Sequence, residues 1–259
     1  MLATVNDLVK LLEELMPSNL AEDWDNVGLM LGRKGKTVKK ILLALDLSKE
    51  VVEQAVAQKI DLIITHHPAI FKKLKRVVDN DWQQDLLLTL AENGIAVYSA
   101  HTNLDCVSAG VNDVLAKLLK LEDIEVLDDG NGLGRIGVVE EASLAEYAQV
   151  VKAALKADYV VVADAGKKVH KVAVCGGAGS DLIDLALAKG ADTLVTGDVK
   201  YHSAQQAVFS GLNIIDAGHQ PTELPVLEKL ADRLSLRLVE RDMDVVVNVA
   251  KETLILRHV

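Results

Sequence analysis

The chain has 259 residues, of which half are hydrophobic and a quarter are charged, the balance of a folded globular protein and not of a disordered one. Lysine and arginine number 28 against 38 aspartates and glutamates, and the resulting net charge of −10 argues against nucleic acid as a partner. Aromatic residues make up only 3%, which argues against the stacking platforms of single-strand binders.

The sequence contains no run of about 18 apolar residues, so we expect no membrane-spanning helix. The N-terminal segment lacks the basic start and the cleavage site of a signal peptide. Two cysteines, Cys106 and Cys175, are too few for a disulfide framework and are expected to be small buried side chains. These features together predict a cytoplasmic protein.

The first half of the chain alternates helices and buried strands. Apolar spacing predicts a helix over residues 4–16, with Thr4 or Asn6 as its cap, followed by a polar loop over residues 22–28. Buried strands are predicted within residues 39–48 and 61–65, and the helix between them is capped by Ser48. This alternation predicts an α/β fold with a mostly parallel sheet.

The second half repeats the pattern of the first. Residues 171–198 align with residues 40–67 at an offset of 131 without a gap, with identities at Asp61 and Asp192 and at Thr65 and Thr196. Each copy runs on to a strand that starts at glycine, over residues 94–100 and 211–218. We interpret this as an internal duplication, with a chance match of strand and helix patterns as the alternative. The predicted repeats are residues 1–125 and 126–259, and the glycine-rich segment 121–143 between them is a hairpin candidate.

Histidines and acids follow the buried strands. His66 and His67 come directly after the strand that ends at Thr65, where ligands gather at the carboxyl edge of α/β sheets. Two adjacent histidines point to opposite sides of an extended chain, so they would serve two neighbouring ions, or one ion and a supporting contact. The plain alternative is a pair of surface or capping histidines.

Two further strands end in a histidine followed four residues later by an acid: His101 with Asp105, and His219 with Glu223. Four histidines and two carboxylates suit zinc, manganese, iron or cobalt better than calcium or magnesium. Six ligands favour a centre of two ions about 3.5–4 Å apart that share a carboxylate. Such ions carry four positive charges, of which Asp105 and Glu223 offset two, so the excess would activate a bridging hydroxide and attract an anionic substrate.

Six motifs in order resemble the NIF-three-like family, also called GTP cyclohydrolase 1 type 2 homologues or dinuclear metal centre hexameric proteins: residues 23–28, 65–68, 101–105, 175–180, 196–202 and 218–223. The resemblance implies two intertwined, duplicated α/β repeats, two divalent metal ions per chain, a homohexameric ring and the short form of the family without an inserted domain. It implies that the metal ligands are His66, His67, Asp105, His219 and Glu223, with His101 as a possible additional ligand.

Other motifs carry weaker signals. Gly132, Gly134 and Gly137 spell a dinucleotide-binding pattern but lack the strand before and the helix after it, so a hairpin turn is expected. The glycine loop 176–179 either presents amides, such as those of Gly177 and Gly179, to an anion or forms a turn that Ser180 caps.

Several polar and aromatic side chains allow two interpretations. Lys200 could contact a substrate phosphate and His202 could move a proton, or both could be plain surface residues. Trp24 either anchors its loop or lines the site, and the basic residues of segment 72–76 form either a solvated face or a guide for anions. His170 and His258 lack partner patterns and are expected to face solvent.

These motifs lead to two hypotheses. The first is a metal-dependent hydrolase that acts on a small anionic, nucleotide-like compound. The second is a hexameric metal-binding scaffold, or a metal-delivery or regulatory protein, without enzymatic activity. The sequence does not separate them, because both require the same ligands.

Overall fold

The computed structural model describes residues 2–256, which form two compact units. The first unit takes the chain up to Val107 together with Leu227–Thr253, and the second takes Ser108–Val226 and the residues from Leu254 onward. The repeats predicted from the sequence, 1–125 and 126–259, are defined by the duplication. The compact units have a different boundary, because the chain leaves the first unit after Val107. His258 lies outside the described residues.

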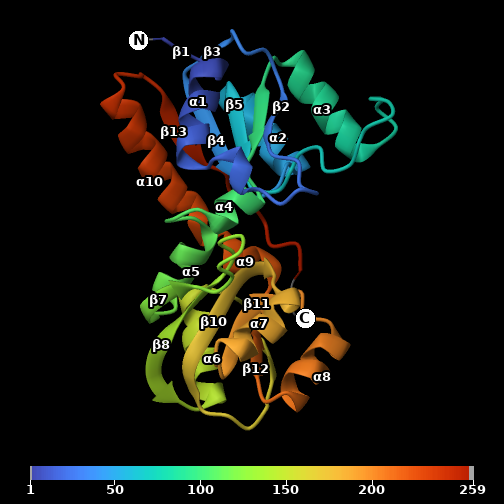
Figure 1. The fold of residues 1–259 in the computed structure, drawn as a ribbon. Helices are drawn as coiled ribbons and strands as arrows, with labels where there is room; N and C mark the ends of the chain where they lie inside the picture. The colour runs from blue at the N-terminus through green and yellow to red at the C-terminus, as the bar shows by residue number, and fades with distance from the viewer. Residues whose placement is uncertain (1, 257–259) are drawn as a thin grey trace. The chain divides into compact units, whose positions relative to one another are not determined.

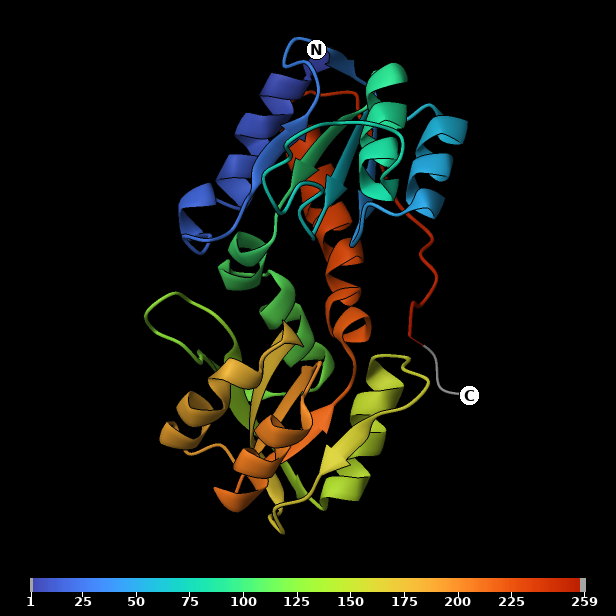
Figure 2. The same ribbon diagram turned by 90° about the vertical axis from the view of Figure 1, so that its right-hand side faces the viewer.

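The first unit is an α/β layer structure whose elements are β1 (Ala3–Thr4), α1 (Val5–Leu15), η1 (Ser18–Leu20), β2 (Gly28–Leu31), β3 (Thr37–Val38), β4 (Lys40–Ala44), α2 (Lys49–Gln58), β5 (Leu62–Thr65), α3 (Trp82–Glu92), β6 (Ala96–Ser99), α4 (Thr102–Cys106) and β13 (Val246–Val249). Helix α10 (Pro225–Glu240) belongs to this unit from Leu227 onward. The main sheet has the order β13-β4-β5-β6-β2, parallel except for β2 (Figure 1). Helices α2 and α3 pack on one face, and α1 lies on the other (Figure 2).

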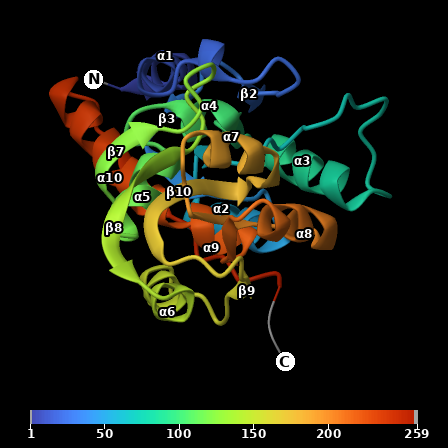
Figure 3. The same ribbon diagram turned by 60° about the horizontal axis from the view of Figure 1, so that its bottom comes forward.

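The second unit contains α5 (Val111–Leu118), β7 (Glu122–Val126), β8 (Arg135–Ala142), α6 (Leu144–Ala154), β9 (Val161–Ala163), β10 (Val169–Ala178), η2 (Ser180–Leu182), α7 (Ile183–Ala188), β11 (Thr193–Gly197), α8 (Tyr201–Phe209), β12 (Asn213–Asp216) and α9 (His219–Glu223). Its sheet has the order β7-β8-β10-β11-β12-β9, with β10, β11 and β12 parallel. Apolar clusters cover both faces: α5 and α6 contribute to one, α7 and α8 to the other (Figure 3).

The duplication predicted from the sequence is visible in the strand register. Ile41 pairs with Leu62 between β4 and β5, and the residues 131 positions later, Val172 and Thr193, pair between β10 and β11. In each sheet an antiparallel strand also lies beside the last of the parallel strands, β2 beside β6 and β9 beside β12.

The identity of Asp61 and Asp192 has a shared structural cause. The Asp61 carboxylate accepts hydrogen bonds from the backbone amides of Lys39 and Lys40, at 2.9 and 3.2 Å. The Asp192 carboxylate accepts the equivalent amides of residues 170 and 171, at 2.9 and 2.7 Å. A carboxylate therefore satisfies the same two successive amides in each copy, near the start of β4 and of β10.

Local predictions are largely confirmed. Thr4 and Ser48 cap α1 and α2, and both cysteines are buried. The glycine pattern at residues 132–137 lies in the β7–β8 hairpin and not at a helix start. Ser180 is not a cap, because the short helix η2 begins at Ser180 with Gly179 before it. Among the described residues, none of the helices has the length and apolar character to cross a bilayer.

Candidate metal centre

The first unit gathers three histidines and one aspartate at the carboxyl edge of its sheet. His66 and His67 follow β5, while His101 follows the neighbouring parallel strand β6 and precedes α4, which carries Asp105. The chain bends at His66 and His67 and is not extended there, so the expectation that the two rings point apart does not hold. Nitrogen atoms of the three histidines lie within 4.8 Å of one another, close enough for the group to hold a metal ion.

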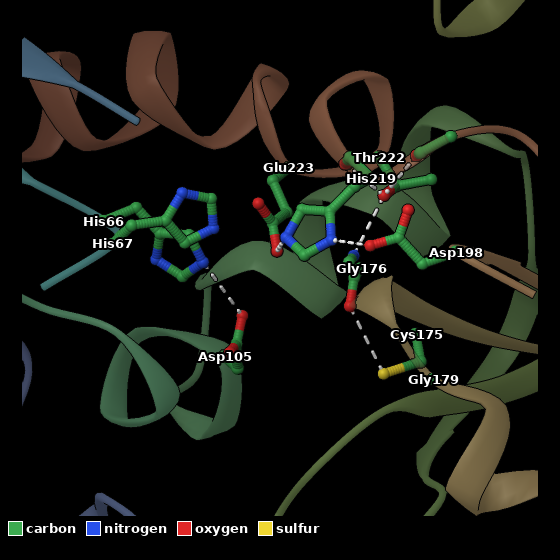
Figure 4. Close-up of polar contacts among 12 residues, drawn as sticks. His66, His67, Asp105, Cys175, Gly176, Gly179, Asp198, His219, Thr222 and Glu223 are labelled. Carbon is green, nitrogen blue, oxygen red and sulfur yellow. Dashed lines mark hydrogen bonds and ion pairs between the residues drawn. The ribbon is translucent and has the colours of Figure 1, made fainter. Parts of the chain in front are cut away.

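Asp105 belongs to the same group. Its Oδ1 lies 3.6 Å from Nε2 of His66, a separation that one ion could bridge (Figure 4). His66 is 1% exposed and Asp105 is 8% exposed, so both are shielded from water. The sequence predicted that His101 and Asp105 lie close to His66 and His67. Within this unit, that prediction is confirmed.

Each histidine of this cluster has its Nδ1 held by an oxygen. The acceptors are the carbonyl of Ala100 for His66, Asp46 for His67 and Asp25 for His101, each at 2.9 Å. When Nδ1 donates its proton to such an acceptor, Nε2 carries the lone pair that can coordinate a metal. The hydrogen bonds therefore select one tautomer and one orientation for all three rings.

Asp25 holds His101 from a loop that lies 76 residues earlier in the chain. Its second carboxylate oxygen accepts from the backbone amide and the hydroxyl of Thr102, at 3.1 and 2.6 Å. Burial alone would raise the pKa of Asp25, but the hydrogen bonds from His101 and Thr102 lower that pKa well below its usual range. Asp25 therefore stays ionised and keeps the start of α4 in place.

Glu252 supports the His67 side of the cluster. Its carboxylate accepts from the backbone amides of Leu45 and Asp46, at 2.7 and 3.1 Å, across more than 200 residues of sequence. Burial raises the pKa of Glu252 despite these two hydrogen bonds. The segment after β13 thus fixes the backbone of Asp46, which in turn orients His67.

The second unit carries a smaller group on α9. His219 and Glu223 are one helical turn apart, with Nε2 and Oε1 separated by 3.2 Å. Nδ1 of His219 donates to Asp198 at 2.8 Å, which repeats the pattern of the first unit (Figure 4). Glu223 is 3% exposed. A buried carboxylate beside an oriented imidazole is a donor pair that fits a divalent metal ion.

Gly177 makes room for this pair. Its φ is +65°, and a Cβ there would lie 2.3 Å from Oε1 of Glu223 and 3.2 Å from Nε2 of His219. The backbone thus approaches both donors more closely than any other residue would allow.

The glycine loop does not offer free amides to an anion in this conformation. The amide of Gly176 donates to Asn112, that of Gly177 to Thr222 and that of Gly179 to Thr196, at 2.8–2.9 Å. The amides of Gly177 and Gly179, which the sequence suggested as anion-binding groups, are therefore engaged within the protein. Their glycine character serves close packing, since a Cβ at Gly179 would meet Thr196 at 2.6 Å.

The structure separates the remaining candidates. Lys200 and His202 are exposed at the start of α8, and their substrate-contacting roles stay predictions. His170 is exposed, as expected. Trp24 contacts the His101 ring at a centroid distance of 6.1 Å and so lies beside the first cluster. Asp25, and not Trp24, anchors the loop.

The sequence did not reveal that Asp25, Asp46 and Asp198 are the hydrogen-bond acceptors that hold three of the histidines. Asp46 and Asp198 follow the strands β4 and β11 by one or two residues. The rule that functional groups gather at strand ends could have found these two. Asp25 had no such signal, because it comes from an irregular loop.

Comparison with known proteins decides the family. The family model described as Duf34/NIF3 (NGG1p interacting factor 3) matches residues 3–253. The chain belongs to the DUF34/NIF3 family. A relative from Clostridium perfringens with the name GTP cyclohydrolase 1 type 2 homolog is 37% identical over 255 residues, 96% of each chain. One of the same name from Lactococcus lactis is 38% identical over 234 residues, 89% of this chain and 91% of that one.

Solved structures of DUF34/NIF3 relatives confirm the fold. The Bacillus cereus protein related to NIF3 matches with a TM-score of 0.95 and 27% identity over all of both chains. Reduced HcgD from Methanocaldococcus jannaschii matches with a TM-score of 0.83 and 33% identity, covering 97% of this chain and 99% of that one. The mixed α/β architecture described above is therefore the DUF34/NIF3 fold.

Proposed function

We propose that this DUF34/NIF3 protein is a metal-dependent hydrolase that acts on a small anionic, nucleotide-like compound. The observation that supports it is the shared design of the four histidines, His66, His67, His101 and His219: each has Nδ1 held by an oxygen, which leaves Nε2 as the coordinating atom. The exposed His170 also has its Nδ1 held, by the carbonyl of Val139 at 2.7 Å, so what distinguishes the four is a held ring that has further ligand atoms beside it. His66, His67 and His101 have nitrogens within 4.8 Å of one another, and Glu223 lies 3.2 Å from His219. Relatives that carry the name GTP cyclohydrolase 1 type 2 homolog add support for a nucleotide-like substrate.

The proposed ligands are His66, His67, Asp105, His219 and Glu223, with His101 as an additional ligand or a support. Imidazole and carboxylate donors suit zinc, manganese, iron or cobalt. We assign both groups to one centre of two ions because of the duplication. In each repeat, the third parallel strand is followed by a His-x3-acid motif.

When bound in such a centre, divalent ions would lower the pKa of water and would stabilise negative charge at the reacting atom. The residues of the chain set the tautomers, exclude bulk water around the buried His66 and Glu223, and supply the compensating carboxylates. We also propose that the chain assembles with itself into a homohexamer, which native mass spectrometry tests by the presence of a six-chain species.

The test is turnover of a panel of nucleotides and phosphoesters by metal-stripped protein and by protein reloaded with each of the four metals. We expect hydrolysis only after reloading, and its loss in His66→Ala. His170→Ala is the matched control, because His170 is an exposed histidine outside both groups. Metal binding without turnover of any compound would instead support a scaffold or metal-delivery role.

A further inference from the structure

The tryptophan and phenylalanine side chains all lie at the surface of the described part of the chain. The sequence contains two tryptophans and two phenylalanines. All four are exposed, Trp24 at 60%, Phe71 at 48%, Trp82 at 71% and Phe209 at 81%, so the core is built without them. Exposed rings that gather in one place mark a binding surface more often than scattered ones.

Two of these rings gather beside the first histidine cluster. The centroids of Trp24 and Phe71 are 6.1 Å apart, and the His101 ring lies 6.1 Å from the former and 6.4 Å from the latter. The three planes meet at 71–87°, so they form a corner with faces in three directions. The His101 ring is in turn 5.3 Å from that of His66. A flat molecule in this corner would lie one ring away from the candidate metal ligands.

The backbone on both sides of the corner is fixed. Asp25, next to Trp24, is held by His101 and Thr102. The side-chain amide of Asn26 donates to the carbonyl of Ile70, next to Phe71. Rings on backbone that is already ordered lose little further freedom when they bind a ligand.

Positive charge adjoins the corner. Residues 70–78 contain no acid and four exposed cations, Lys72, Lys73, Lys75 and Arg76, in a chain of net charge −10. Ile70 and Leu74 pack against the apolar cluster of the unit and so tie this basic segment to the sheet.

The carboxylates around the first histidine cluster carry negative charge. An anion therefore needs the positive charge of the basic segment in order to bind there. Asp25, Asp46 and Asp105 lie against the histidine rings, and Glu252 lies behind Asp46, so the surroundings of the site are acidic. One divalent ion would leave this cluster without excess positive charge. From the sequence, the metal ions were expected to attract an anionic substrate. With their charge offset by the acids, that attraction must come from the lysines and the arginine of segment 72–76.

We propose that Trp24 and Phe71 form a stacking subsite for a planar heteroaromatic ring, and that the basic segment 72–76 binds the phosphate groups of the same molecule. This inference rests on the proposed function, because it assigns the substrate of that site to the class of heteroaromatic phosphates. Ring and phosphate bind independently of the ions, so the subsite can be tested on metal-free protein.

The experiment is titration of metal-stripped protein with GTP as the probe, followed by calorimetry and by tryptophan fluorescence, in buffer free of divalent ions. We expect Trp24→Ala and Phe71→Ala each to weaken GTP binding roughly tenfold, as loss of a stacking ring does. Trp24→Phe keeps a ring and should retain most of the affinity. Lys72→Ala with Lys73→Ala should weaken binding and reduce its salt dependence.

The chain provides matched controls. Trp82→Ala and Phe209→Ala remove exposed rings elsewhere, and Lys167→Ala with Lys168→Ala removes two exposed charges of the second unit. The proposal is overturned if these controls weaken GTP binding as much as the subsite variants, or if inorganic tripolyphosphate binds as tightly as GTP. It is also overturned if wild-type protein binds no GTP at millimolar concentration, which would leave the rings as a surface for a protein partner.

Failure of the subsite and failure of the proposed function give different results. If the subsite is wrong, Trp24→Ala binds GTP like wild type whether or not the protein takes up metal. If the metal centre is wrong, the metal-free GTP affinities follow the expected pattern but no metal is bound.

Discussion

Substitution of Gly177 by alanine tests whether the close approach of its backbone shapes the second ligand group. The left-handed φ of +65° alone costs a non-glycine residue roughly 1 kcal/mol. The new Cβ would also lie 2.3 Å from Oε1 of Glu223, closer than real contacts allow, and Glu223 is buried with little room to move. Accommodating the new Cβ forces the buried carboxylate to shift, and overpacking of this kind costs about 2 kcal/mol.

Gly94→Ala is the matched control. Gly94 has a φ of +64°, and a Cβ there would meet nothing within 4 Å. The control therefore carries the backbone strain of Gly177→Ala without the clash. We expect a loss of about 3 kcal/mol for Gly177→Ala and about 1 kcal/mol for Gly94→Ala, which correspond to Tm decreases of roughly 6–12 °C and 2–4 °C.

The assay is thermal unfolding of metal-free protein, followed by metal uptake in equilibrium dialysis. Gly177→Ala should bind less metal than Gly94→Ala, because only the former displaces Glu223. Equal Tm decreases and equal metal uptake in the two variants would refute the reasoning.

Three further predictions concern carboxylates. Asp198→Ala should lower metal affinity about 10- to 100-fold, because His219 loses the acceptor that fixes its tautomer; unchanged affinity in a competition titration with a chelator would count against it. Glu252→Ala should lower the free energy of unfolding by about 2 kcal/mol, since two buried amides lose their acceptor; denaturant unfolding measures this, and a change below about 0.5 kcal/mol contradicts it. Asp61→Asn should lower Tm more at pH 7 than at pH 3. Burial alone would raise the pKa of Asp61, but its hydrogen bonds and the nearby Lys36 lower it, so its contribution is present above the unfolded pKa near 3.9 and is lost as pH falls. An equal decrease at both pH values would contradict that assignment.

Sequence reasoning succeeded where the evidence was local or repeated. Helix caps such as Thr4 depend on neighbouring residues, so their pattern is legible in the chain. The duplication was detectable because Asp61 and Asp192 perform the same backbone contact in each repeat. The rule that strand ends collect ligands placed His66 and Asp105 together.

What the sequence did not yield depends on distant segments. The loop that holds His101 through Asp25 comes 76 residues before it, and Glu252 reaches Asp46 from 206 residues away. From the sequence, the amide of Gly177 is a possible anion contact, whereas in the fold it donates to Thr222, which lies 45 residues further along. Such pairings are set by the tertiary fold, and spacing in one sequence does not reveal them.

The most direct test of the central claim is the number of metal ions bound per chain, measured by elemental analysis after the stripped protein is dialysed against zinc, manganese, iron or cobalt. We expect two ions per chain for wild type and a clear loss in both His66→Ala and Glu223→Ala, with His170→Ala unchanged. Wild-type protein that retains no ion with any of the four metals would contradict it.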